Sequence, residues 1–224
     1  MPRERLQALA RVLLDLVYPV DCVLCEFPRY ALCPQCERGL ADGSESRALL
    51  LGRGNVPLVL VSRAHPEMIR VLTRVKDLGQ TELARPLGRL LRARIVRLLA
   101  SAGSECVIVA APTAPGSFVK RGFHPVGLML RHARLQVRPW LMSRTRARDQ
   151  RGLSADERAR NLRGSLVADP RARGVKVILV DDVVTTGATV IECVRALTEA
   201  GAEVVCVVAL TAVPRKFPQF ALNA

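Results

Sequence analysis

One segment near the C-terminus, VILVDDVVTTGAT at 177–189, constrains the fold of this 224-residue chain more than any other. Its apolar start, directly before two adjacent aspartates, is typical of a strand that is buried on both faces. A helix is expected over 187–200, with the apolar positions Val190, Val194 and Leu197 at helical spacing. Gly201 would end this helix, and a second apolar strand follows at 203–210. This strand–helix–strand order predicts an α/β fold with a parallel sheet.

The same segment carries a candidate ligand site. Asp181 and Asp182 are expected at the carboxyl end of the strand, where ligands of parallel sheets bind, and their carboxylates can accept hydrogen bonds from sugar hydroxyls. The following turn offers hydroxyls and helix N-terminal N–H groups to a phosphate, and Gly187 lets the backbone approach it closely. The residues expected in this phosphate-binding turn are Val184, Thr185, Thr186, Gly187, Ala188 and Thr189. The alternative is that the aspartates only end a strand and cap a helix.

Further apolar segments predict the remaining elements of this domain. We expect strands at 56–61 and 106–111, the latter ended by Pro112, and helices at 65–76, 83–98 and 127–132. Polar and glycine-rich residues at 42–46 and 52–55 indicate a linker and a turn. The sequence therefore predicts an α/β domain over 56–213, followed by a loose tail over 214–224.

Seven cysteines divide into a cluster of four and three isolated residues. The cluster consists of two Cys-x2-Cys pairs, Cys22, Cys25, Cys33 and Cys36, whose spacing favours a structural Zn²⁺ site with no open position for catalysis. A redox pair and an iron–sulfur cluster are the alternatives. Cys106, Cys193 and Cys206 lie in apolar segments and are expected to be buried. With an amphipathic helix ahead of it, the zinc finger would form a separate unit over 1–42.

The formal net charge of +14 would attract polyanions, including nucleic acid. Aromatic residues make up only 4% of the chain, which disfavours an extended base-stacking surface. Genomic base composition, or arginines that bind pyrophosphate, would also account for the charge. Seven arginines lie in the polar segment 143–163, which we interpret as a mobile lid, with a solvated loop as the alternative.

The chain shows no signal for a membrane or for secretion. Arg11 and Asp15 interrupt the apolar N-terminal segment, and no small-residue cleavage site follows. No later segment reaches the roughly 18 uninterrupted apolar residues of a membrane span. We therefore expect a soluble protein of the cytoplasm.

Together these features resemble the ComF family, named for a competence protein of bacterial DNA uptake. Besides the cysteines and the 177–189 segment, the matching motifs are KDLG at 76–79, RGF at 121–123, QRGLS at 150–154 and RARNL at 158–162. The resemblance implies a small zinc finger with four cysteine ligands, followed by a Rossmann-like, parallel-sheet type I phosphoribosyltransferase domain. It also implies that phosphoribosyl pyrophosphate (PRPP) binds with Mg²⁺.

The resemblance assigns roles to the candidate site residues. Asp181 and Asp182, the candidate catalytic pair, would hold the ribose hydroxyls, and the turn at 184–189 would wrap the 5′-phosphate. The cations for the pyrophosphate could come from the arginines of 144–163 or from Lys120 and Arg121.

This chain departs from the family pattern at several positions. The loop at 110–117 lacks the usual cations for pyrophosphate, His124 replaces an asparagine, and Ala147 replaces a lid threonine. His124 is expected to be a loop or cap residue rather than a base. Thr185 stands where transferases of 6-oxopurines carry an aspartate, which disfavours purine salvage.

Two functions therefore stay open. The first is a phosphoribosyltransferase with an unidentified acceptor. The second is a non-catalytic PRPP- or nucleotide-sensing adaptor in DNA uptake or nucleic-acid metabolism. Partners of such an adaptor would include single-stranded DNA or proteins of the competence machinery.

Overall fold

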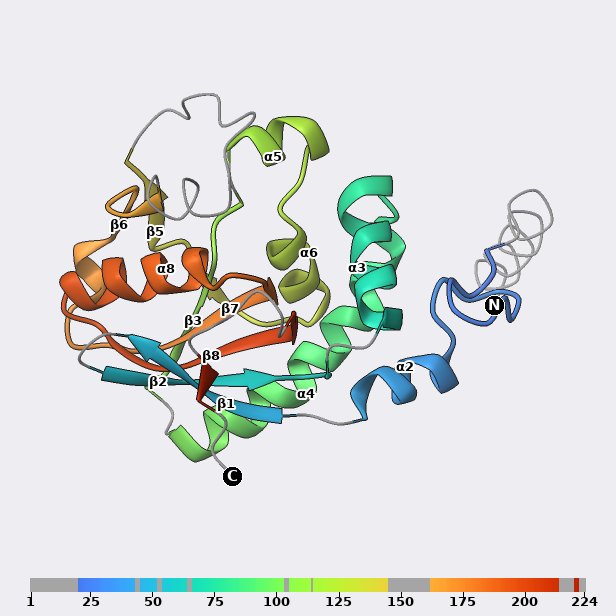
Figure 1. The fold of residues 1–224 in the computed structure, drawn as a ribbon, viewed down its shortest axis with the longest axis horizontal. Coiled ribbons are helices and arrows are strands. Elements are labelled where there is room, and N and C mark those ends of the chain that lie inside the picture. Colours follow the sequence, from blue (N-terminus) through green and yellow to red (C-terminus); the bar gives the residue numbers. More distant parts are fainter. Residues whose placement is uncertain are drawn as a thin grey trace, which may run out of the picture.

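A computed structural model describes residues 20–42, 45–51, 54–63, 66–102, 105–113, 115–144, 162–213 and 220–221. Its centre is a seven-stranded sheet (Figure 1). The strands, in spatial order, are β4 (Val137–Arg138), β3 (Val107–Ala110), β7 (Lys176–Val184), β8 (Glu203–Ala212), β2 (Gly54–Leu60), β1 (Glu45–Leu51) and β9 (Phe220–Ala221). The first five are parallel, whereas β1 is antiparallel to both neighbours, so the predicted parallel α/β sheet is confirmed.

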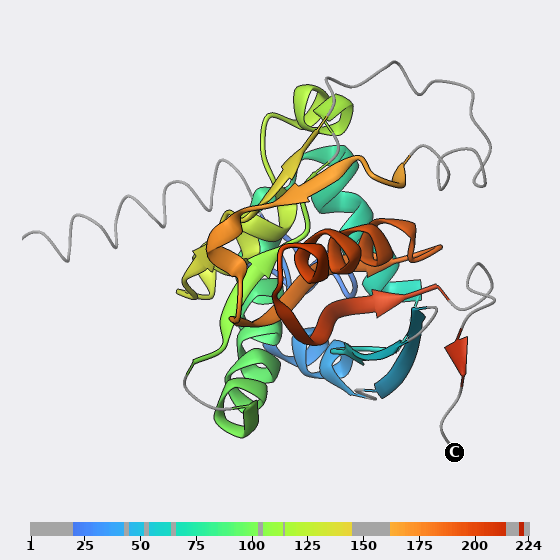
Figure 2. The same ribbon diagram turned by 90° about the vertical axis from the view of Figure 1, so that its left-hand side faces the viewer.

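Helices cover both faces of the sheet (Figures 1 and 2). On one face lie α3 (Pro66–Leu78), the short 3₁₀ helix η1 (Thr81–Leu83), α4 (Ala84–Ala102) and α6 (Pro125–His132). On the other face lie α8 (Ala188–Glu199) and a small antiparallel sheet of β5 (Leu141–Ser143) and β6 (Leu166–Ala168). A second 3₁₀ helix, η2 (Pro170–Ala172), leads from β6 to β7.

The central strands are apolar without alternation because each face meets a different core. Ile178 and Val180 of β7 belong to the core formed with α3, α4 and α6. Val177 and Leu179 of the same strand belong to the core formed with α8. All four side chains are fully buried, which explains why the sequence shows a continuous apolar segment here.

Two helices of the first face approach each other very closely at a glycine. A Cβ atom on Gly88 of α4 would lie 2.4 Å from the carbonyl oxygen of Met129 in α6. A guanidinium N–H of Arg92 in α4 also donates to the carbonyl oxygen of Ala133, at 2.8 Å. Only glycine allows this helix contact.

The cysteine unit packs against the same face. Its helix α2 (Pro34–Ala41) lies beside α4 (Figure 1), where Arg89 donates from Nε to Glu37 at 2.9 Å. Leu32 and Leu40 are buried in the core formed by α3, α4 and α6. The unit is therefore joined to the α/β fold by both apolar contacts and an ion pair.

The strands and helices predicted between residues 56 and 132 are present as β2, α3, α4, β3 and α6, near their expected bounds. Several elements were not predicted, namely α2, the 3₁₀ helices η1 and η2, the strands β1, β4, β5, β6 and β9, and the helix α5 (Pro115–Arg121). The predicted linker at 42–46 is wrong in part, because Glu45 and Ser46 already belong to β1. The predicted loop at 110–117 is confirmed only at 111–113, because Ala110 ends β3 and residues 115–117 begin α5.

Two predicted segments overlap little with the described residues. The predicted amphipathic helix, which ends at Pro19, lies outside them, and the lid predicted over 143–163 is described only at its ends. In the predicted loose tail, Phe220 and Ala221 pair with Leu49 and Ala48 of β1. The domain boundaries stay a prediction. Within the described parts of the chain, no helix combines the length and apolar character that a membrane span requires.

Candidate functional site

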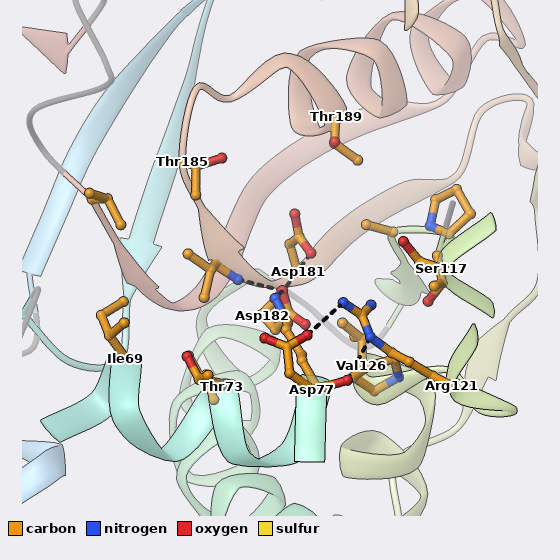
Figure 3. Close-up of a pocket in the computed structure, with 18 residues that line it drawn as sticks. Ile69, Thr73, Asp77, Ser117, Arg121, Val126, Asp181, Asp182, Thr185 and Thr189 are labelled. Atoms are coloured by element: carbon orange, nitrogen blue, oxygen red, sulfur yellow. Dashed lines mark hydrogen bonds and ion pairs between the residues drawn. The ribbon is translucent and has the colours of Figure 1, made fainter. Parts of the chain in front are cut away.

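A cavity of about 370 Å³ opens at the carboxyl edge of the parallel strands (Figure 3). It lies between the end of β7, the last turns of α3, the loop after β3, and α5. Its polar lining residues are Thr73, Lys76, Asp77, Thr113, Ser117, Arg121, Asp181, Asp182, Thr185 and Thr189. The sequence-predicted acidic pair, Arg121 and part of the threonine-rich turn are thus brought to one cavity.

The acidic pair does not end its strand, contrary to the expectation from the sequence. The strand β7 continues beyond it, with Val183 and Val184 paired to Thr211 and Ala212 of β8. Each carboxylate accepts a hydrogen bond from the next backbone N–H, Asp181 from Asp182 at 2.8 Å and Asp182 from Val183 at 2.7 Å. These bonds fix the orientation of both side chains at the cavity.

The two carboxyl groups differ in environment. Burial, followed by repulsion from the Asp182 carboxylate, raises the pKa of Asp181 from 3.8 to about 7. The Lys76 ammonium opposes this shift. Near neutral pH, Asp181 therefore exists in both protonation states and can donate or accept a hydrogen bond to a ligand hydroxyl.

The turn after β7 leads directly into the N-terminus of α8. Gly187 precedes α8 in a left-handed conformation, with φ of 74°. The Thr186 hydroxyl accepts weakly from the Ala188 N–H at 3.4 Å. Thr185 of the turn and Thr189 of α8 line the cavity (Figure 3). The other predicted residues do not line it: Val184 ends β7, Thr186 and Gly187 lie in the turn, and Ala188 begins α8. Phosphate binding by this turn stays a prediction.

Sequence reasoning missed the role of Lys76. Its Nζ lies 2.7 Å from Asp182 Oδ1 in an ion pair between α3 and β7. Arg121 of α5 donates from Nε to the carbonyl oxygen of Lys76 at 2.7 Å and lies 3.5 Å from Asp77 Oδ1. The KDLG and RGF motifs thus meet at the acidic pair, and their presence in one family pattern was the only sequence signal for this contact.

The loop after β3 presents Ala111, Pro112 and Thr113 to the cavity, so this part of the wall carries no cation. The next residue to line the cavity is Ser117 of α5. His124 occupies the N-cap position of α6, and its ring stacks on Phe118 with centroids 4.3 Å apart. The prediction that His124 is a loop or cap residue agrees with this position.

The four clustered cysteines form a candidate metal centre. The Sγ atoms of Cys22, Cys25, Cys33 and Cys36 all lie within 4.8 Å of one another, and Cys25 and Cys33 are 3.6 Å apart. A tetrahedral Zn²⁺ with ordinary Zn–S bonds holds its sulfur atoms about 3.8 Å apart, so these residues fit the ion. The backbone N–H groups of Cys33 and Cys36 point at Sγ of Cys22 and Cys33, each at 3.4 Å.

The isolated cysteines behave as apolar residues. Cys193 and Cys206 are buried and Cys106 is half-buried. Burial raises the pKa of each thiol, that of Cys206 to about 11, which keeps them protonated and unreactive. The expected burial is confirmed for Cys193 and Cys206, whereas Cys106 only packs against the edge of the core.

The sequence comparison identifies one family. The phosphoribosyl transferase domain family matches residues 133–217, which is less than half of the chain. The match begins just before β4, includes β7 and α8, and ends beyond β8, so it contains the acidic pair and the threonine-rich turn. No curated protein matches the sequence.

Solved structures that match include phosphoribosyltransferases. The allosteric regulatory enzyme of purine biosynthesis is 25% identical, with 57% of this chain and 25% of that chain covered and a TM-score of 0.36. A phosphoribosyltransferase from Corynebacterium diphtheriae is 20% identical, with coverages of 67% and 96% and a TM-score of 0.37. An orotate phosphoribosyltransferase from Mycobacterium tuberculosis H37Rv, in complex with PRPP, is 16% identical, with coverages of 68% and 93% and a TM-score of 0.35.

This chain spans only a quarter of the first of these structures. All three TM-scores are below 0.5, so these structures support no function for this chain. The family match over residues 133–217 and the parallel sheet agree on the class of domain. This chain carries a phosphoribosyl transferase domain on a parallel-sheet α/β fold, with a cysteine cluster ahead of it that can hold a metal such as zinc.

Proposed function

We propose that this chain binds PRPP together with Mg²⁺ and is a ComF-type member of the phosphoribosyltransferase family, located in the cytoplasm. One observation carries the proposal. Asp181 and Asp182 face the same cavity as Thr185 and Thr189, which belong to the turn and first helical residues after β7. This places acceptors for sugar hydroxyls beside donors for a phosphate, as a ribose 5-phosphate group requires.

Each part of the ligand has a partner of suitable chemistry. The carboxylates of Asp181 and Asp182 accept from the ribose 2′ and 3′ hydroxyls. The 5′-phosphate binds to the hydroxyls of Thr185 and Thr189 and to backbone N–H groups at the start of α8, where the helix dipole favours an anion. Because Gly187 adopts φ of 74°, the turn can curve around the phosphate without a Cβ in the way.

The charges of the site explain why Mg²⁺ is part of the proposal. Among the described residues that line the cavity, three are acidic and two basic, Lys76 and Arg121. This balance does not neutralise a diphosphate, so a divalent cation on the ligand oxygens is needed. Carboxylate oxygens are also suitable outer partners for hydrated Mg²⁺. When bound, Mg²⁺ would stabilise the negative charge that develops on the departing diphosphate.

As an enzyme, the protein would break the bond between ribose C1 and the diphosphate and form a bond from C1 to an acceptor. Asp181 and Asp182 would hold the ribose in place while positive charge develops on its ring. A second function, a PRPP-sensing adaptor without catalysis, is favoured by the cation-poor loop at Ala111–Thr113. Single-stranded DNA or competence proteins would then be its partners, attracted in part by the net charge of +14.

Calorimetry with PRPP and Mg²⁺ tests the binding step. We expect saturable binding by the zinc-loaded wild type and its loss in the double variant Asp181→Asn/Asp182→Asn. Asp169→Asn is the matched control, because Asp169 precedes η2 and does not line the cavity. A folded wild type that shows no binding would rule out both the enzyme and the sensor.

Pyrophosphate release then separates the two functions. The wild type is incubated with PRPP, Mg²⁺ and each of a panel of nucleobases and amines, and the released pyrophosphate is measured. Release that depends on one acceptor, and that the double aspartate variant lacks, selects the enzyme. Binding without release for any acceptor selects the sensor.

A further inference from the structure

Lys76 and Arg121, the two cations among the described residues of the cavity wall, are held in different ways. Arg121 is engaged by α3, since Nε donates to the Lys76 carbonyl oxygen at 2.7 Å and a terminal guanidinium nitrogen lies 3.5 Å from Asp77. Lys76 reaches the acidic pair itself, with Nζ 2.7 Å from Asp182 Oδ1. Arg121 thus holds the backbone of α3 at the point where Lys76 turns toward β7.

The Lys76 ammonium can donate hydrogen bonds besides the one in this ion pair. An ammonium carries three N–H donors, and the bond to Asp182 uses one of them. The Lys76 side chain lines the cavity and is 23% exposed, so its charged end is not sealed inside the core. A compact cation on a flexible stem can bind a second anion while it keeps the first.

The position of Lys76 relative to a bound ribose follows from the ligand's covalent structure. The proposed function has Asp181 and Asp182 hold the ribose 2′ and 3′ hydroxyls. The diphosphate of PRPP is attached to C1, which is bonded to the carbon that carries the 2′ hydroxyl. A cation in contact with the acidic pair therefore lies close to the diphosphate.

We propose that Lys76 binds the diphosphate of PRPP, bridging it to Asp182, and so supplies the positive charge that the loop at Ala111–Thr113 lacks. This inference rests on the proposed function and assigns one residue to one part of its ligand. The competing role is purely structural, in which Lys76 only neutralises Asp182. The two roles differ in which ligands depend on the lysine.

The test compares two ligands in the wild type and three variants. Dissociation constants for PRPP and for ribose 5-phosphate, both with Mg²⁺, are measured calorimetrically for the wild type, Lys76→Met and Lys76→Arg. Lys176→Met is the matched control, since Lys176 is exposed at the opposite end of β7. Circular dichroism and zinc content establish that each variant is folded.

A charge-assisted hydrogen bond predicts that Lys76→Met weakens PRPP binding by about 10- to 100-fold. Binding of ribose 5-phosphate, which has no diphosphate, should change by less than about threefold, and Lys76→Arg should recover part of the PRPP affinity. Equal weakening of both ligands, or no change for either, would overturn the inference while the proposed function stands. If Lys76→Met does not fold, Lys76→Gln is measured in the same way.

Discussion

Asp181→Asn should remove most of the pH dependence of folding stability between pH 5 and pH 8. Burial and the neighbouring Asp182 raise the pKa of Asp181 from 3.8 to about 7 in the folded protein. In the unfolded chain this carboxyl is ionised above about pH 4. Folding therefore takes up a proton between these pH values, and the free energy of unfolding falls as the pH rises through this window.

The size of the effect follows from the shift. Each pH unit in the window lowers the free energy of unfolding by about 1.4 kcal/mol. From pH 5 to pH 8, the free energy of unfolding of the wild type therefore falls by roughly 2–3 kcal/mol relative to that of Asp181→Asn. For a chain of this length, this corresponds to a relative change in Tm of roughly 5–10 °C. The Asn side chain keeps an oxygen that can accept the Asp182 N–H bond, so the hydrogen bond itself is preserved.

The assay is urea denaturation of the wild type and Asp181→Asn without ligand, at several pH values and with zinc loaded. Asp169→Asn is the control for the change of residue type. A hydrogen bond from Arg171 lowers the pKa of Asp169 to about 2, so its removal should not alter the slope between pH 5 and pH 8. Parallel stability curves for the wild type and Asp181→Asn would refute a raised pKa for the carboxyl at position 181.

Three further perturbations test the packing, the turn and the metal centre. Gly88→Ala should destabilise the fold by about 1–3 kcal/mol in urea denaturation, because its Cβ would lie 2.4 Å from the Met129 carbonyl oxygen; an unchanged midpoint would contradict this helix contact. Gly187→Ala should lower the free energy of unfolding by about 1–2 kcal/mol, because φ of Gly187 is 74°, and it should weaken ribose 5-phosphate binding. An unchanged free energy of unfolding would contradict this left-handed conformation. The purified protein should contain one zinc ion, which Cys22→Ser loses and Cys193→Ser keeps, as measured by metal analysis; equal zinc in both variants would exclude the cysteine cluster as the site.

The central strands and helices could be predicted because their sequence pattern follows directly from burial. Both β7 and β8 are covered on each face, so they appear as continuous apolar segments. Gly201, with φ of 87°, closes the intervening helix, as the sequence indicated. Local pattern and tertiary environment agree in this part of the chain.

The elements that were missed lack a clear local sequence pattern. Strand β1 follows polar residues typical of a linker, and it exists because it pairs along its whole length with β2. Helix α5 has only seven residues and begins at Pro115 in a segment that looks like a loop. Proline is acceptable at the first helical position, so its presence does not exclude a helix.

In the site, too, the features that depend on neighbouring residues in the sequence could be predicted, whereas those that depend on tertiary contacts could not. The acidic pair and the turn are adjacent in sequence, so their proximity could be predicted. The ion pair from Lys76 to Asp182 joins residues that are far apart in sequence, and only the packing of α3 beside β7 brings them together. Continuation of β7 beyond the aspartates also depends on its partner, because β8 pairs with Val183 and Val184.

A crystal structure of the protein with ribose 5-phosphate and Mg²⁺ tests the central claim most directly. We expect the phosphate within hydrogen-bond distance of the Thr185–Thr189 turn, and the 2′ and 3′ hydroxyls on the carboxylates of Asp181 and Asp182. A ligand bound elsewhere, or bound here with its phosphate on the acidic pair's side of the cavity, would contradict the account.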